Sequence, residues 1–263
     1  MDMKKLILLS ISIMFFAHCA DAQFWFGPKV GVQRTNYKYR DDNHSNLYNV
    51  DVGLNYNVGV AIEYSTTGAF EIHTEIVYQR VSNKVTNKEF LDPIVSESTY
   101  NYISAPLLMR AVFGTPPFNF YVNFGPRLSY WLGGSGSYFS DEFSDFSDDP
   151  RKYDIVFAEP TQNLVVQGDA FFIPRPNRLQ YAFDFGGGLL LGINENQRVM
   201  IDVRYSFGHS NMAFNDGSDL GNLFNYDEDL EYAHRMMIFS VAYLFGYDIQ
   251  AKKKGRSTSR ISK

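Results

Sequence analysis

The stretch from Tyr181 to Ile193 reads YAFDFGGGLLLGI, and its side chains alternate in character with a period of two. The odd-numbered positions carry Tyr, Phe, Phe, Gly, Leu, Leu and Ile, whereas the even-numbered positions include Ala, Asp and several Gly. Successive side chains of a strand point to opposite faces, so one face suits lipid and the other suits a crowded polar interior. This pattern is typical of a strand of a transmembrane β-barrel.

Seven other stretches alternate in a similar way, and each is long enough to cross a bilayer at a tilt, which takes about 9–11 residues. We therefore predict eight strands, at Phe24–Tyr39, Asp51–Tyr64, Ala69–Val81, Tyr100–Phe113, Phe118–Leu132, Tyr181–Ile193, Arg198–His209 and Arg235–Asp248.

The connectors between these strands are alternately short and long. The short ones, residues 65–68, 114–117 and 194–197, contain residues that favour tight turns. The long ones are residues 40–50, 82–99, 133–180 and 210–234. Outer-membrane barrels keep short turns in the periplasm and long loops outside. The prediction is an all-β fold, an eight-stranded antiparallel transmembrane β-barrel over residues 23–250, with short periplasmic turns and long extracellular loops.

The first 22 residues read as a cleaved signal peptide. Lys4 and Lys5 precede an apolar run from Leu6 to Ala17, and a small-residue site, Ala-Asp-Ala, ends at Ala22. The run is shorter than the ~20 residues that a spanning helix needs. Cys19 is the only cysteine and raises a lipoprotein alternative, but the bulky His18 precedes it. We expect export to the outer membrane and a mature chain without disulfides or cysteine-based sites.

The C-terminal residues 251–263 form a basic tail in a chain whose net charge is −5. With both termini predicted in the periplasm, Lys252, Lys253, Lys254 and Arg256 are candidate contacts for an acidic partner or for anionic headgroups. The alternative is a disordered, solubilising tail. Nucleic acid is not an expected partner in that compartment.

The predicted inner face carries charges of both signs. A soluble lipocalin-like barrel buries apolar residues instead, so these charges argue against that alternative. The interior of an eight-stranded barrel is just wide enough for side chains to fill it. We therefore predict a structural network of paired charges rather than a transport pathway. Its members are Lys29, Glu63, Glu71, Glu75, Arg110, Arg127, Asp184, Asp202 and Arg204, with His73 beside them.

Aromatic residues near the strand ends are candidates for the girdles that mark the two membrane interfaces. They are Trp25, Phe26, Tyr64, Tyr100, Phe118, Phe120, Tyr130, Trp131, Phe207 and Tyr247.

Catalysis would require a nucleophile, a base and an orienting acid at one rim. His209, Ser210 and His234 border one long loop, which also holds Asp216 and Asp219, but no nucleophile-elbow motif is present. Residues Ser140–Asp149 hold clustered carboxylates, which bind calcium in some proteins, although the spacing does not match an EF-hand. We predict no enzymatic activity, no cofactor, no metal and no small-molecule substrate.

Three segments resemble the PorT family of outer-membrane β-barrel proteins from Bacteroidetes-type bacteria. They are Glu97–Arg110 (ESTYNYISAPLLMR), Tyr121–Arg127 (YVNFGPR) and Arg204–Asn211 (RYSFGHSN). His209 stands where the family has an apolar residue. The resemblance implies an outer-membrane barrel and a link to type IX protein secretion and gliding motility, and it implies no catalytic residues.

The first functional hypothesis is an accessory or assembly component of type IX secretion. It would act through contacts of loops 133–180 and 210–234, or of the tail, with outer-membrane lipid and other secretion proteins as its partners. The alternatives are a structural or adhesive barrel without a secretion role, and an outer-membrane lipase or acyltransferase.

Overall fold

The structure is a computed structural model that describes residues 23–39, 48–65, 68–87, 95–139, 150–158, 169–213, 218–220, 227–228, 230 and 232–248. Three segments of the prediction lie outside these residues. They are the signal peptide, the acidic segment 140–149, and the basic tail with Lys252, Lys253, Lys254 and Arg256. Within the described part, no helix is long and apolar enough to cross a membrane.

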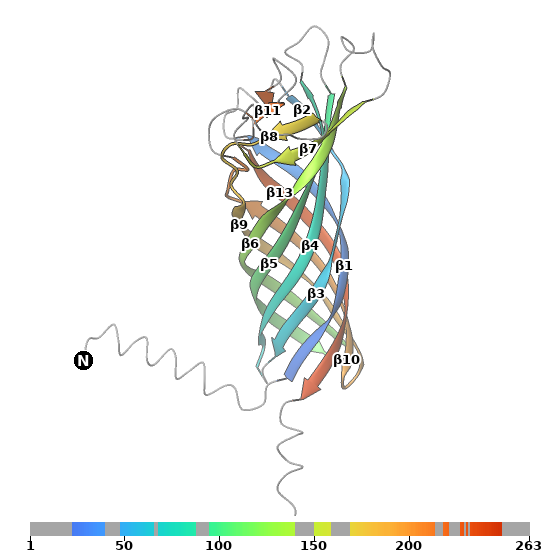
Figure 1. Cartoon of the computed structure of the whole chain (residues 1–263). Helices are drawn as coiled ribbons and strands as arrows, with labels where there is room; N and C mark the ends of the chain where they lie inside the picture. The colour runs from blue at the N-terminus through green and yellow to red at the C-terminus, as the bar shows by residue number, and fades with distance from the viewer. Residues whose placement is uncertain are drawn as a thin grey trace, which may run out of the picture.

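Eight long strands form a closed ring of antiparallel pairs. In ring order they are β1 (Gln23–Tyr39), β3 (Leu54–Ser65), β4 (Phe70–Asn87), β5 (Val95–Thr115), β6 (Phe118–Phe139), β9 (Leu179–Asn194), β10 (Gln197–Gly208) and β13 (Tyr232–Asp248). The ring closes where β13 pairs with β1, from Gln23 opposite Asp248 to Tyr39 opposite Tyr232. Figure 1 shows the resulting tilted barrel. The predicted eight-stranded antiparallel barrel is confirmed.

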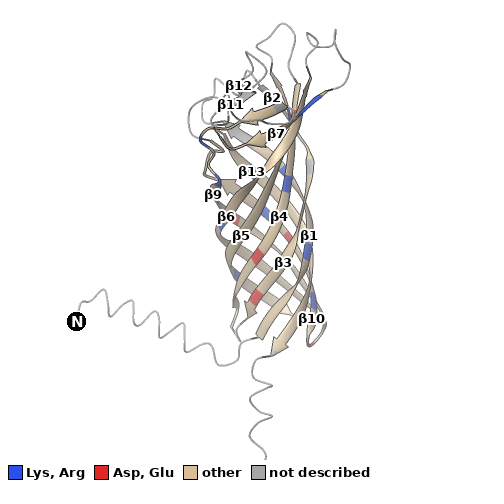
Figure 2. Ribbon diagram, viewed as in Figure 1, with Lys and Arg blue, Asp and Glu red and all other residues tan. Residues whose placement is uncertain are grey.

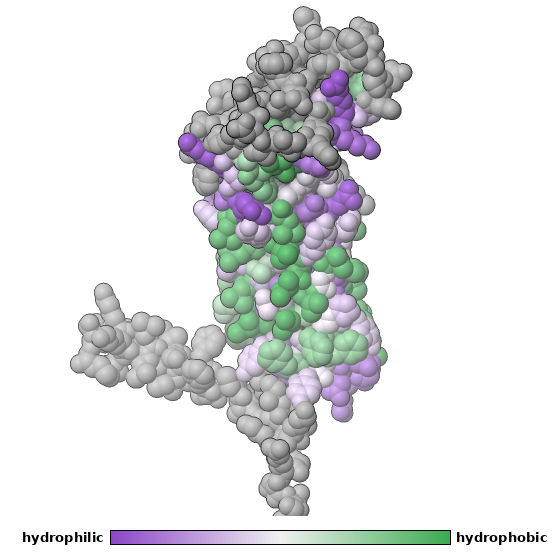
Figure 3. All heavy atoms as spheres, viewed as in Figure 1, coloured by the Kyte–Doolittle hydropathy of each residue, from purple (hydrophilic) through white to green (hydrophobic). Residues whose placement is uncertain are grey.

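The outer wall of the barrel is apolar. On β6, Phe120, Val122 and Phe124 are each about half exposed, whereas Tyr121 and Asn123 between them are buried. Figure 3 shows, on the face it draws, an apolar belt on the barrel wall with hydrophilic residues above and below it. Exposed apolar surface of this extent is expected where the surrounding solvent is lipid.

Several strands continue beyond this belt at the long-loop end. The prediction placed residues 82–99 in a loop, but β4 extends to Asn87 and β5 begins at Val95. The register continues through Lys84 opposite Glu97 and Val85 opposite Ser96. Outside the bilayer the outward face meets water, so the apolar alternation that marks a spanning strand disappears while the hydrogen-bond ladder continues.

The second predicted strand, Asp51–Tyr64, is two strands that separate at Gly53. β2 (Tyr48–Val52) pairs with the upper end of β4, whereas β3 pairs with β1 and with lower β4. The Asn55 side chain links the two segments, since its amide donates to the carbonyl oxygens of Gly53 and Ser82, both at 3.2 Å. Its carboxamide oxygen accepts from the Ser82 amide at 2.6 Å. A side chain thus replaces ladder bonds at the break.

The long connector between β6 and β9 folds into part of a small extracellular sheet. β7 (Arg151–Val156) pairs with upper β6, β8 (Asp169–Phe172) runs parallel to β7, and β11 (Ser218–Leu220) and β12 (Asp227–Glu228) follow at its far side. We call the β7–β8–β11–β12 sheet the cap. Figure 1 shows β7, β8 and β11 lying at the upper end of the barrel.

The prediction of interface girdles was wrong for three aromatic residues. Trp25, Tyr100 and Trp131 are buried inside the barrel, whereas Phe26, Phe118 and Tyr130 face outward as predicted. The inward ring of Trp25 lies under the Arg198 guanidinium, whose carbon is 4.1 Å from the ring centroid. Sequence position near a strand end does not distinguish the two faces, because one residue of register reverses the direction of every side chain.

Two glycines of β9 provide a matched test of interior packing. A Cβ at Gly188 would lie 2.0 Å from the Ile201 carbonyl oxygen and 2.5 Å from the Tyr121 hydroxyl, whereas one at Gly192 would meet nothing closer than 3.9 Å. We expect Gly188→Ala to lower the free energy of unfolding by about 1–3 kcal/mol, as overpacking does, and Gly192→Ala to change it little. Urea titration of the barrel folded in lipid vesicles measures both. Equal effects of the two variants would contradict this packing.

Candidate functional site

The lower third of the interior is organised around Glu63. One carboxylate oxygen of Glu63 accepts from Arg110 and the other from Arg198. The same two guanidinium groups also reach Glu71, at 3.6 Å from Arg110 Nη1 and 3.5 Å from Arg198 Nη1. The Arg110 guanidinium lies over the Tyr121 ring, 4.0 Å from its centroid. Two arginines and two glutamates from four different strands are thereby held together.

Glu75 is the centre of the middle third. Its Oε1 accepts from Lys29 Nζ at 2.5 Å and from Arg204 Nη2 at 2.7 Å. Arg204 also donates to Asp202 Oδ2 from Nε at 2.9 Å and from Nη2 at 2.7 Å. All four side chains are almost fully buried. Pairing at this depth is required, because an isolated buried charge is strongly unfavourable.

His73 connects the lower and middle groups. Its Nδ1 is 2.8 Å from Glu63 Oε1, and its Nε2 is 2.6 Å from Glu75 Oε1. A carboxylate only accepts hydrogen bonds. Both contacts are therefore hydrogen bonds only when the imidazole carries both protons or when one of the facing carboxyl groups is protonated.

Arg127 and Asp184 extend the network upward. Arg127 donates to Asp184 Oδ2 from Nε at 3.0 Å and from Nη2 at 2.6 Å, and Arg204 Nη1 lies 3.6 Å from the same oxygen. With His73 between Glu63 and Glu75, the chain of polar contacts is thus continuous from Arg198 to Arg127. Figure 2 shows acidic and basic residues together on the barrel strands.

The structure places all nine sequence-predicted network residues, and His73, on the inner face. It adds one member, Arg198, which the sequence reasoning missed. Arg198 shares the even-numbered face of β10 with Asp202 and Arg204, so counting back from those two residues would have found it. The described interior then holds five Lys or Arg and five Asp or Glu side chains, so these ten groups carry no net charge when all are ionised.

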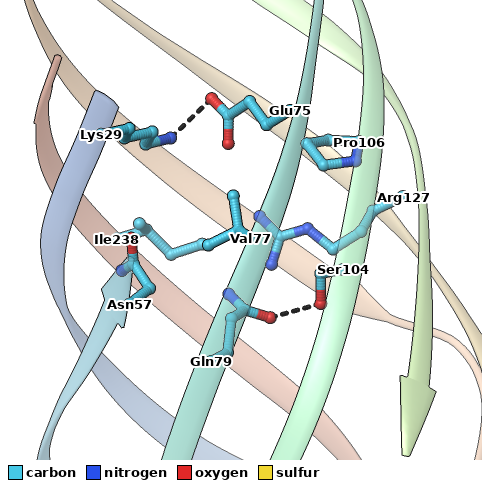
Figure 4. Close-up of a pocket in the computed structure, with 9 residues that line it drawn as sticks. All are labelled: Lys29, Asn57, Glu75, Val77, Gln79, Ser104, Pro106, Arg127 and Ile238. Carbon is cyan, nitrogen blue, oxygen red and sulfur yellow. Dashed lines mark hydrogen bonds and ion pairs between the residues drawn. The ribbon is translucent and has the colours of Figure 1, made fainter. Parts of the chain in front are cut away.

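One cavity lies in this interior between Lys29, Glu75 and Arg127 (Figure 4). Ser104 and Gln79 form its edge toward the long-loop end, where the Ser104 hydroxyl donates to Gln79 Oε1 at 2.5 Å. The cavity has room for about one water-sized sphere, and buried polar sites of that size hold single ordered waters.

An aromatic layer closes the interior above the charges. The Tyr102 and Trp131 rings stack with centroids 6.2 Å apart, and the His234 ring meets Tyr102 and Tyr232 edge-on at 5.8 and 5.7 Å. The Tyr102 hydroxyl is 3.4 Å from His234 Nε2. Tyr102, Trp131 and Tyr232 belong, with Tyr100, to one buried cluster that continues into the cap.

Tyr153 of β7 fixes the cap to the barrel. Its hydroxyl is 3.1 Å from the Ser96 hydroxyl and 2.7 Å from that of Ser98, and its ring packs on Phe171 of β8 with centroids 5.5 Å apart. A Cβ at Gly136 would lie 2.4 Å from the Tyr153 ring, so only glycine leaves room for this contact. The cap is therefore a packed continuation of the barrel interior.

Two of the candidate catalytic residues, His209 and His234, lie on opposite faces of the barrel wall. His209 is exposed and its ring lies 5.8 Å from that of Tyr181, whereas His234 is buried within the aromatic layer. The Ser210 hydroxyl accepts from the Tyr181 amide at 2.8 Å. Asp216 and the side chain of Asp219 lie outside the described residues. Within the described chain, no group of three or more His, Cys, Asp and Glu residues is arranged to hold a metal ion.

Comparison with known proteins assigns the family. Residues 19–213 match the family described as outer membrane protein beta-barrel domain. The chain belongs to this family. Together with the closed antiparallel ring, the match makes this an outer-membrane β-barrel protein.

Several solved outer-membrane proteins are similar in structure. OprG from Pseudomonas aeruginosa is 11% identical over 86% of this chain and 95% of that chain, with a TM-score of 0.42. Neisserial surface protein A is 10% identical over 84% and 96%, with a TM-score of 0.36. Ail from Yersinia pestis is 10% identical over 85% and 99%, with a TM-score of 0.35. No curated protein sequence matches the chain significantly.

Proposed function

We propose that this protein is a non-enzymatic outer-membrane barrel that acts through contacts at its extracellular end or through its tail, as an accessory or assembly component of type IX protein secretion. The observation that carries the contact mechanism is the filled interior. Two groups of salt bridges, joined through His73, fill the barrel from Arg198 to Arg127, and the aromatic layer lies above them.

A filled interior disfavours a role as a conduit. Opening a path would require separation of buried ion pairs such as Arg204 with Glu75, and each charge left without its partner would be strongly unfavourable. The extracellular end is built differently, since β4, β5 and β6 extend beyond the apolar belt and support the cap. Rigid elements that extend beyond the membrane present a surface to partners.

The assignment to secretion rests on the resemblance of three segments to the PorT family, at Glu97–Arg110, Tyr121–Arg127 and Arg204–Asn211. The separation of His209 from His234 on opposite sides of the wall supports a role without hydrolysis or acyl transfer.

A deletion of the gene in its native host tests this function. We expect the deletion to reduce the amount of secreted and cell-surface cargo, and the full-length gene to restore it, because an assembly component is needed for export. Quantitative mass spectrometry of the culture supernatant and of the cell surface measures this. Unchanged export with an intact outer membrane would contradict the secretion role and leave a structural or adhesive barrel.

Two complementing variants locate the contact. One ends the chain after residue 250, and the other replaces residues 140–149 by a Gly-Ser linker, so neither alters a described strand of the barrel ring. A heat-modifiable band on a denaturing gel verifies that each variant is folded at normal abundance. Loss of export in one variant assigns the contact to that segment. Full export in both would contradict contact through the tail and through this acidic segment.

A further inference from the structure

Three arginines lie on the outer wall just above the apolar belt. On β1, the lipid-facing positions carry Val30 and Val32 and then, nearer the long-loop end, Arg34. On β13, the lipid-facing Met237 is followed in the same direction by Arg235. On β4, Arg80 follows the outward positions of Ile76 and Tyr78. Arg34 and Arg80 are exposed and Arg235 is half-buried, while their sequence neighbours point inward. We call these three residues the arginine patch.

The strand register brings the patch together on one side of the barrel. Arg235 pairs with Asn36, two residues along the same face of β1 from Arg34. Arg34 pairs with Leu54 of β3, and Arg80 pairs with Tyr56, the next residue of β3 on that face. Neighbouring strands are ~4.8 Å apart, so the patch extends about 15 Å across β13, β1, β3 and β4.

The patch differs from the other basic groups of the barrel wall. Within the described part of the chain, no acidic side chain forms an ion pair with any of its three arginines, whereas the interior arginines are all paired. Lys84, four residues above Arg80, is paired with Glu97 at 3.3 Å. Arg178 is not part of the patch, because it stacks on Tyr130 of β6, with its guanidinium carbon 4.7 Å from the ring centroid.

The position of the patch identifies its ligand chemistry. It lies at the long-loop end, where the apolar belt meets the outer-leaflet headgroups, and the face drawn in Figure 3 has hydrophilic residues directly above the belt. A guanidinium group binds phosphate through paired N–H donors, and clusters of basic residues at a membrane surface bind anionic lipid. The short turns at residues 114–117 and 194–197 contain no Lys or Arg.

We propose that Arg34, Arg80 and Arg235 bind the phosphate groups of an anionic glycolipid of the outer leaflet. The lipid lies along β13, β1, β3 and β4, with its acyl chains on exposed apolar side chains such as Val32 and Met237. Each arginine places its donors at headgroup height while its stem covers the upper edge of the belt.

Native mass spectrometry of the full-length barrel in detergent tests this site, with diphosphorylated lipid A and its dephosphorylated form as the probes. We expect the triple variant Arg34→Gln, Arg80→Gln, Arg235→Gln to bind diphosphorylated lipid A roughly a hundredfold more weakly, since each basic residue near an anionic surface contributes a factor of about five. Binding of the dephosphorylated lipid should be unchanged. Added salt should weaken only the phosphate-dependent part.

A second triple variant controls for the loss of charge. Arg151→Gln, Lys152→Gln, Arg175→Gln removes three exposed positive charges of the cap region. We expect its affinity for diphosphorylated lipid A to equal that of the unmodified protein. Equal weakening by both triple variants, or no weakening by the arginine-patch variant, would overturn the proposal. Displacement of the lipid by millimolar inorganic phosphate alone would also overturn it, because the site would then bind free phosphate.

Discussion

Replacing Glu63 by alanine should lower the free energy of unfolding by about 3–5 kcal/mol, because it removes the carboxylate that accepts from both Arg110 and Arg198 and leaves these arginines only their longer contacts to Glu71. Glu63 has no solvent-exposed surface, so water cannot replace the lost carboxylate without rearrangement. Equilibrium unfolding by urea or guanidinium in lipid vesicles, followed by the heat-dependent gel shift of the folded barrel, measures the change.

Two further variants separate the possible causes. Glu63→Gln keeps the side-chain volume and removes the charge, so we expect most of the loss to remain if charge pairing is responsible. Glu97→Ala breaks an exposed ion pair, in which the Glu97 side chain is 60% exposed and the Lys84 side chain 46%. This variant should lower the free energy of unfolding by only about 0–1 kcal/mol. A Glu63→Gln variant as stable as the unmodified protein would contradict the role of the charge network.

Placing an arginine at Phe124 should destabilise the folded barrel by about 2–4 kcal/mol, because this outward position lies halfway along the lipid-facing part of β6. The same substitution at Phe118, at the turn end of the strand, should cost about 0–1 kcal/mol, since the interface is more polar. Both residues are aromatic and about half exposed, so the comparison isolates depth in the bilayer. Folding titrations into phospholipid vesicles measure both variants.

The expected depth dependence follows from lipid rather than from packing within the protein. A barrel surrounded by water would tolerate arginine equally well at both positions. Equal effects at Phe124 and Phe118 would therefore contradict the placement of the bilayer along β6.

The spanning part of the fold was predictable because lipid imposes a pattern on the chain. Each strand that crosses the bilayer must present apolar side chains outward, so a period of two marks segments such as Tyr181–Ile193 directly in the sequence. Extension of β4 to Asn87 was not predictable in this way. Beyond the belt the outward face meets water, so outward residues such as Lys84 are polar and the apolar period of two that marks a spanning strand is absent.

The interior charge network was likewise predictable in one respect and not in another. The alternation alone places Glu75, Asp184 and Arg204 on the inner face. It does not say which acid meets which base, because pairs such as Arg204 with Glu75 are 129 residues apart and depend on closure of the ring. The inward positions of Trp25 and Trp131 were likewise misassigned by sequence, since only the register of the closed barrel decides the face of a residue near a strand end.

The sequence by itself determined the class of fold, the two faces of each spanning strand and the end of the barrel that bears the long connectors, because lipid outside and a narrow interior restrict every second residue. Tertiary structure alone decided the pairing of charges around Glu63 and Glu75, the closure of the interior by aromatic rings and cap, and the gathering of Arg34, Arg80 and Arg235 on one wall. These features depend on distances between strands that are remote in the chain, and those distances exist only once the ring has closed.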